Sequence, residues 1–210
     1  MTYAYDELYV LLAQRVLGDM YDYAVNTLGI KIEQFQQMFL VSSIAKQIAI
    51  GNPTYIAGMN GCEVAKNVVE ECTGTYPENE DEMYLDKSVE YWIGWSLAYY
   101  QWISGRDFKT IERACPIDTL YGMYVTLHEA DISLFVETMN EKCETYLSES
   151  RLRRLRKYAE LTQKELAIKA DVPLRQIQLF EQGYRDIGKC QVNTLINIAG
   201  ALRCSVEELV

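Results

Sequence analysis

The sequence predicts an all-α protein, with an acidic N-terminal helical domain at residues 1–149 and a five-helix domain at residues 150–210. Apolar residues recur at the three- and four-residue spacing of a helix face along most of the chain. No run alternates strongly enough between apolar and polar residues to indicate a strand. The length of 210 residues suits one large domain or two small ones, and 49% apolar residues are enough for a packed core.

Helices in the N-terminal domain are placed by their apolar spacing and by the residues that stop them. Gly29 ends a first helix at residues 6–28, and Gly51-Asn52-Pro53 ends a second at 31–50. The polar segment 73–81 predicts a loop, Gly105 ends a helix at 86–103, and Pro116 separates two short helices. The other expected helices lie at residues 61–71, 108–113, 117–127 and 132–147.

The C-terminal domain begins with a basic helix at residues 151–160 and continues with a helix opened by a capping box. In that box, the Thr162 hydroxyl caps the helix and Glu165 reaches back to Thr162. Asp171-Val172-Pro173 makes a turn, and Pro173 suits the first position of a helix at residues 173–182. A fourth helix is expected at about residues 189–202, with Gly188 as cap between Ile187 and Val192 as a hydrophobic staple, and Ser205 with Glu208 opens a fifth.

The helix at residues 173–182 has two distinct faces. At 100° per residue, Ile177 and Phe180 share one face and are expected to pack inward with Val172. The opposite face carries Arg175, Gln178, Leu179 and Gln182. Arginine and glutamine carry the donor and acceptor patterns that read guanine and adenine in the major groove. This face is therefore a candidate DNA-reading surface.

The segment from Leu161 to Gly183 resembles the Cro/cI-type, lambda-repressor-like helix-turn-helix. The resemblance covers the last 60 residues and rests on Thr162-Gln163, Glu165-Leu166-Ala167, Val172, Ile177, Glu181, Gly183, Thr194-Leu195, Ile198-Ala199, Ala201-Leu202, Ser205 and Glu208-Leu209. It implies that Gln163 holds a phosphate and that Arg156 and Glu181 form a structural ion pair. The implied base-reading residues are Leu174, Arg175, Gln178 and Leu179, and the phosphate donors after the helix are Tyr184, Arg185 and Lys189.

Charge is divided unevenly between the two domains. Residues 1–149 contain 9 Lys or Arg against 23 Asp or Glu, a formal charge of −14. Residues 150–210 contain 11 against 7, a charge of +4, and the two parts sum to the net charge of −10. A basic module on an acidic body indicates contact with nucleic acid through the module alone.

The sequence offers little for catalysis, metal binding or membrane insertion. Six scattered cysteines without a CxxC pair and a single histidine, His128, make a zinc site improbable, so reduced and mostly buried thiols are expected. No Gly-rich phosphate loop, nucleophile elbow or paired metal motif is present, and we expect no enzyme and no cofactor. No signal peptide and no membrane-spanning apolar run were found, so a soluble cytoplasmic protein is expected.

Two features of the N-terminal domain permit a structural and a functional interpretation. Aromatic residues at helical spacing (Tyr91, Trp92, Trp95, Tyr99 and Trp102) form either core or a ligand cage, and core is favoured. Gly94 in the same helix predicts a close helix crossing. His128-Glu129-Ala130-Asp131 is interpreted as a cap and surface turn rather than a metal or catalytic site.

The functional prediction is a sequence-specific regulator of transcription, a repressor, that binds double-stranded DNA as a homodimer on two half-sites. Its N-terminal domain would sense a small effector or a partner protein. The alternative is an antitoxin-type interaction protein, in which the N-terminal domain binds a toxin and the C-terminal domain represses its own operon or binds only protein. Leu174 and Leu179 leave this choice open, because they suit thymine methyl groups and protein surfaces alike.

Overall fold

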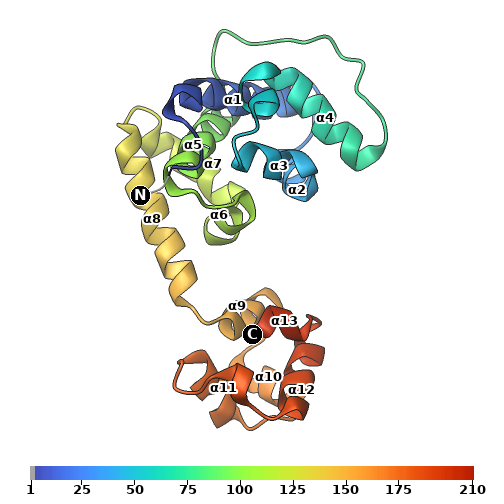
Figure 1. Cartoon of the computed structure of the whole chain (residues 1–210), viewed down its shortest axis with the longest axis vertical. Coiled ribbons are helices and arrows are strands. Elements are labelled where there is room, and N and C mark those ends of the chain that lie inside the picture. The colour runs from blue at the N-terminus through green and yellow to red at the C-terminus, as the bar shows by residue number, and fades with distance from the viewer. Residues whose placement is uncertain (1–2) are drawn as a thin grey trace. The chain divides into compact units, whose positions relative to one another are not determined.

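The computed structural model describes residues 3–210, which are helical over most of their length and contain no strand, so the all-α class is confirmed. The described residues divide into two compact units, 3–143 and 144–210. The elements before residue 150 are η1 (Glu7–Tyr9), α1 (Val10–Asn26), α2 (Ile32–Val41), α3 (Ser43–Ala49), the π-helical turn η2 (Thr54–Gly58), α4 (Gly61–Thr73), α5 (Val89–Ser104), α6 (Phe108–Ala114), α7 (Ile117–Leu127) and α8 (Ile132–Ser148) (Figure 1).

Helix α1 is the centre of the N-terminal unit and packs against both α4 and α5 (Figure 1). The close crossing expected at Gly94 is confirmed, because a Cβ atom added there would overlap the carbonyl oxygen of Leu17 in α1. A Cβ atom added at Gly18 would likewise overlap the ring of Tyr91 in α5. Two glycines therefore allow the backbones of α1 and α5 to approach closely, and this contact fixes the core of the unit.

The single helix predicted at residues 31–50 is wrong, because Ser42 separates α2 from α3. The Ser42 backbone is extended (φ −67°, ψ 155°), and its hydroxyl donates to the carbonyl oxygen of Phe39 at 2.7 Å. Glu71 of α4 accepts hydrogen bonds from the Ser43 backbone N–H at 2.7 Å and from the Ser43 hydroxyl at 3.0 Å. A carboxylate 28 residues away in the sequence thus caps the start of α3.

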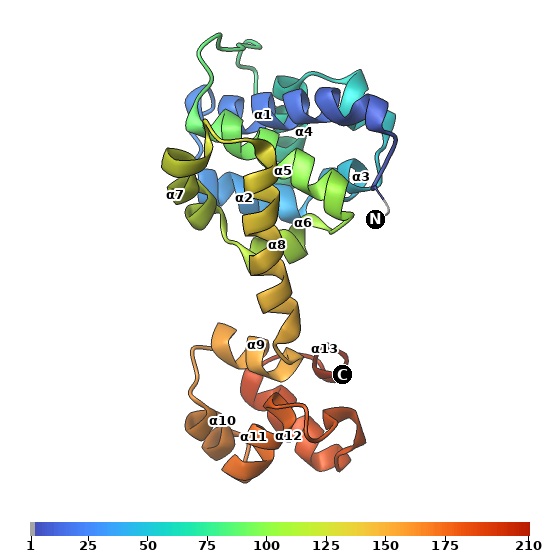
Figure 2. The same cartoon turned by 90° about the vertical axis from the view of Figure 1, so that its left-hand side faces the viewer.

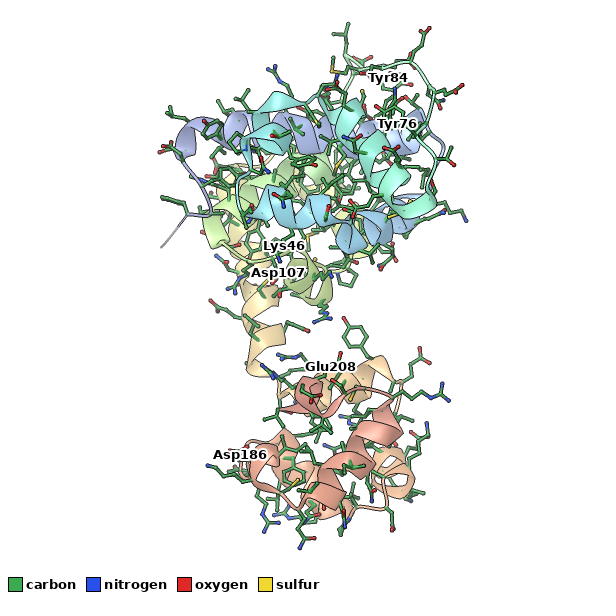
Figure 3. All side chains as sticks on the ribbon, turned by 45° about the vertical axis from the view of Figure 1, so that its right-hand side comes forward. Lys46, Tyr76, Tyr84, Asp107, Asp186 and Glu208 are labelled. Carbon is green, nitrogen blue, oxygen red and sulfur yellow. The ribbon has the colours of Figure 1, made fainter. Side chains whose placement is uncertain are left out.

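The polar segment between α4 and α5 is attached to the unit by side chains of α1 and α4; Figure 3 labels Tyr76 and Tyr84 on it. The buried Lys66 ammonium donates to Asp81 at 2.7 Å and to the carbonyl oxygen of Asn79. The Tyr23 hydroxyl shares its one proton between the carbonyl oxygens of Asn79 and Glu80, at 3.2 and 3.0 Å. The bond to Asp81 raises the pKa of Lys66 and lowers the pKa of Asp81.

The C-terminal unit contains α9 (Arg151–Tyr158), α10 (Gln163–Lys169), α11 (Leu174–Glu181), the 3₁₀ turn η3 (Ile187–Lys189), α12 (Val192–Leu202) and α13 (Val206–Leu209) (Figure 2). Its core includes Leu152, Leu166, Ile177, Phe180, Ile198 and Leu209, so every helix of the unit contributes to it. The predicted start of the fourth helix is wrong. Gly188 lies inside η3, Gln191 is the N-cap of α12, and Val192 is exposed rather than stapled to Ile187.

Gly94→Ala is expected to lower the free energy of unfolding by about 1–3 kcal/mol or more, because α1 and α5 must separate to admit the methyl group. The matched control is Gly122→Ala in α7, where an added Cβ atom meets no other atom within 4 Å. That change should raise stability by up to about 1 kcal/mol through helix propensity. Urea unfolding followed by circular dichroism measures both, and equal effects would contradict the close-crossing argument.

Candidate nucleic-acid interface

Helix α10 begins at a reciprocal capping box, as the sequence predicts. The Thr162 hydroxyl accepts from the Glu165 backbone N–H at 3.2 Å, and the Glu165 carboxylate accepts from the Thr162 backbone N–H at 2.7 Å. These bonds favour the charged carboxylate and lower the pKa of Glu165. Ser205 and Glu208 form the second predicted box, at the start of α13. Both helix starts are therefore set by four-residue local patterns.

The turn between α10 and α11 is built from Asp171, Val172 and Pro173. Asp171 has a left-handed backbone (φ 51°), which aspartate tolerates better than most residues. Val172 is buried as expected. Pro173 is the N-cap of α11 rather than its first residue, because its ψ of 133° is extended, so α11 covers residues 174–181 instead of 173–182. The Pro173 carbonyl accepts from Gln176 at 2.8 Å and starts the helix.

The two faces predicted for α11 are present in the structure. Ile177 and Phe180 are buried against the core of the C-terminal unit. Arg175 and Gln182 are exposed, and Gln178 and Leu179 are half-buried. Leu174, at the first turn, keeps 38% of its surface exposed. The side chains proposed to read bases thus lie on the face of α11 that the core does not occupy.

Glu181 connects the first three helices of the unit. Its carboxylate accepts from the Arg156 guanidinium of α9 at 2.6 and 3.0 Å, as a two-pronged ion pair. The Gln163 amide of α10 donates to the same carboxylate at 2.8 Å. Arg156 also donates to the carbonyl oxygen of Leu161 at 2.7 Å, and the bond to Glu181 raises the pKa of Arg156. The structure therefore contains the ion pair that the resemblance implied and extends it to a third helix.

Gln163 has a structural role that the sequence did not reveal. Its amide nitrogen carries two N–H groups, and one of them is directed at Glu181. The side chain that the resemblance assigned to a phosphate is thus held in place by the protein itself. Its second N–H is the group that remains for a ligand.

A hollow of about 580 Å³ lies between α9, the start of α10 and the outer face of α11. Three of its lining side chains are cationic, Arg153, Arg156 and Lys164, and one is anionic, Glu181. Glu181 neutralises Arg156, and Glu149 lies 3.7 Å from Arg153 while it also pairs with Lys157 at 2.6 Å. The surplus positive charge at the hollow therefore comes from Lys164 and, only in part, from Arg153. The other lining residues are Thr162, Gln163, Leu174, Gln178 and Gln182.

Arg153 and Lys164 are site candidates that sequence reasoning missed. Arg153 precedes Arg156 by three residues and shares its side of α9, and Lys164 is the second residue of α10. That spacing was visible in the sequence. Their convergence beside Gln178 was not, because it depends on how α9, α10 and α11 pack.

The remaining predicted phosphate donors lie after α11. Tyr184, Arg185 and Lys189 are all exposed, and Figure 3 marks Asp186 in the middle of this segment. Asp186 accepts from the Gly188 backbone N–H at 2.9 Å and lies 3.4 Å from the Lys189 ammonium. None of these three donors lines the hollow. Any contact they make with a ligand is therefore separate from the one offered by Arg153 and Lys164.

The aromatic residues of α5, His128 and the cysteines, which the sequence left open to a functional interpretation, lie in packing contacts, at a helix end or as free thiols. Of the five aromatic residues expected to form core, Trp102 is buried, whereas Tyr91, Trp92, Trp95 and Tyr99 are half-buried, and Trp92 packs edge-on against Phe135. A ring nitrogen of His128 lies 2.7 Å from the carbonyl oxygen of Tyr124 at the end of α7. The six cysteines are free thiols; Cys62, Cys115 and Cys143 are buried, and Cys72 is exposed. Among residues 3–210, no three His, Cys, Asp or Glu side chains are grouped as a metal site.

Comparison of the chain with protein-family models, with curated proteins and with solved structures finds no match. Within the described part of the chain, none of the helices combines the length and the apolar character needed to cross a bilayer.

Glu181→Ala is expected to lower the free energy of unfolding by about 1.5–3 kcal/mol, because it removes a buried carboxylate that accepts charged hydrogen bonds and leaves the Arg156 guanidinium, 12% exposed, without its partner. Lys157→Ala is the control, since it removes an exposed ion pair with Glu149 and should cost at most about 1 kcal/mol. Urea unfolding combined with amide exchange in residues 151–209 measures both. A loss no larger for Glu181→Ala than for Lys157→Ala would show that the buried pair does not hold the unit together.

Proposed function

We propose that the C-terminal unit binds double-stranded DNA sequence-specifically and that the chain is a transcriptional regulator, acting as a repressor. The observation that carries this proposal is the exposed Arg175 and half-buried Gln178 on α11 beside a hollow with surplus positive charge. The two features serve different contacts. Side chains on α11 would meet base edges in the major groove, and cations at the hollow would meet phosphates.

Base reading would depend on the fixed rotation of α11. Ile177, Phe180 and Glu181 are all buried, so the helix cannot turn without breaking core contacts. Arg175 would bind guanine through two hydrogen bonds, and Gln178 would bind adenine in the same way. Leu174 and Leu179 would contact thymine methyl groups.

The backbone contacts would come from Arg153 and Lys164, with the free N–H of Gln163 as an additional donor. Tyr184, Arg185 and Lys189 would bind phosphates beyond the end of α11. The charge of −14 on residues 1–149 would repel DNA. Binding therefore requires the C-terminal unit to face the duplex, and a homodimer would place two such units on two half-sites.

A second candidate is an antitoxin-type interaction protein, and it is favoured by two apolar side chains at predicted reading positions of α11, the partly exposed Leu174 and the half-buried Leu179. Apolar side chains on a reading face also suit a protein surface. In this case the N-terminal unit would bind a toxin or another partner. Selection of bound fragments from genomic DNA with the full chain separates the two candidates, because recovery of no enriched sequence would favour protein binding.

Arg175→Ala with Gln178→Ala is expected to remove sequence preference while leaving the fold intact, since neither side chain is buried. Each good two-bond contact contributes about 1–3 kcal/mol of discrimination, roughly a 10- to 100-fold affinity ratio for each base. Fluorescence anisotropy with the selected site and a scrambled duplex measures this ratio. Lys169→Ala, an exposed basic residue outside the hollow, is the control. Unchanged preference in the double variant would refute the assignment of α11.

Arg153→Ala and Lys164→Ala are expected to weaken binding to all duplexes alike, because phosphate contacts do not depend on sequence. Each should reduce the slope of log K against log salt concentration by about 1. The slope is obtained from anisotropy titrations at several salt concentrations. A change in base preference with an unchanged slope would show that these residues do not contact phosphates.

A further inference from the structure

The 3₁₀ turn η1 and the first turns of α1 carry an apolar surface that the N-terminal unit leaves uncovered. Leu8, Leu11 and Leu12 are 84%, 77% and 42% exposed, and Arg15 completes the same face one turn later. Their spacing of three, four and seven residues is that of a helix packing seam. We call Leu8, Leu11, Leu12 and Arg15 the α1 stripe.

The α1 stripe is presented by a well-anchored segment. Tyr3 stacks on Trp102 of α5 at 4.3 Å between ring centroids. The Ala4 backbone N–H donates to the carbonyl oxygen of Trp102 at 3.0 Å, and the Trp102 indole donates to the carbonyl oxygen of Tyr5 at 2.9 Å. The Asp6 carboxylate caps η1 by accepting from the Leu8 backbone N–H at 3.0 Å. The leucines are therefore held in place although they face solvent.

Charges at the two ends of the α1 stripe are opposite. Glu7 lies at its beginning and Arg15 at its end, and neither forms an ion pair with any of residues 3–210. The 3₁₀ turn η1 and the first turns of α1 separate them by roughly 13 Å along the helix axis. In an antiparallel pair of identical helices, Glu7 of each copy would face Arg15 of the other. The stripe is thus complementary to itself.

From this complementarity we propose that the α1 stripe is the self-association surface of the chain and that its occupant is the α1 stripe of a second copy, packed antiparallel about a two-fold axis. The three leucines of each copy form the apolar centre, and the Glu7–Arg15 pairs form its rim. On a unit with a formal charge of −12 (9 Lys or Arg against 21 Asp or Glu up to residue 143), a surface of three leucines whose acidic rim faces an arginine is also where a second copy meets less repulsion. The proposal is independent of DNA binding, because self-association is measured without DNA.

Sedimentation equilibrium of the full chain tests the proposal. The chain has a mass of 24.2 kDa, and the native protein is expected to sediment at twice that mass. Leu8→Ser with Leu11→Ser should raise the dimer dissociation constant on the order of 100-fold. Val125→Ser, which alters a 77% exposed residue of α7, should leave it unchanged. A native chain that is monomeric at all concentrations, or a double variant that dimerises like the native chain, overturns the proposal.

Reversal of the rim charges tests the antiparallel pairing without removing apolar surface. Glu7→Arg and Arg15→Glu should each weaken the dimer, since each places like charges opposite one another. The two substitutions together should restore the native dissociation constant. Circular dichroism verifies that each variant keeps its helical content. Failure of the double reversal to restore association overturns the pairing of Glu7 with Arg15.

Discussion

The C-terminal unit depends on the buried carboxylate of Glu181. A buried charge is tolerated only when its partners are in place, and here they come from α9 and α10. Because Glu181 points inward together with Ile177 and Phe180, the opposite side of α11 must point outward. The orientation of Arg175 and Gln178 is thus a consequence of burying Ile177 and Phe180 and of satisfying the Glu181 carboxylate on the same side of the helix. The same bonds bring α9 and α10 beside α11, which creates the hollow.

The two units carry net charges of opposite sign, and this difference determines which of them attracts an anionic ligand. The acidic N-terminal unit favours solubility and repels polyanions, whereas the C-terminal unit is basic. Most of the lysine and arginine side chains of the C-terminal unit are exposed. Among the cations that line the hollow, only Arg156 pairs with a buried carboxylate, that of Glu181. Any attraction to an anionic ligand is therefore local and weakens as salt concentration rises.

Features set by neighbouring residues were predictable from the sequence, and features set by distant ones were not. The capping boxes at Thr162 and Ser205 each lie within four residues, and both were predicted correctly. The break at Ser42 depends on Glu71, and the orientation of Gln163 depends on Glu181; neither partner is nearby in the sequence. The all-α class follows from periodicity alone, but the hollow requires the packing of three helices.

The attachment of the segment between α4 and α5 has a consequence for local stability. This segment has no helix or strand of its own. Its main attachments are hydrogen bonds from the side chains of Lys66 in α4 and Tyr23 in α1. Asn60, Cys62 and Thr27 add one side-chain bond each, to Asp81, Glu82 and Tyr84. Loss of this small set of bonds would release the segment while α1, α4 and α5 stay packed. It therefore forms a unit of low opening free energy, where amide exchange and proteolytic cleavage should begin before the core opens.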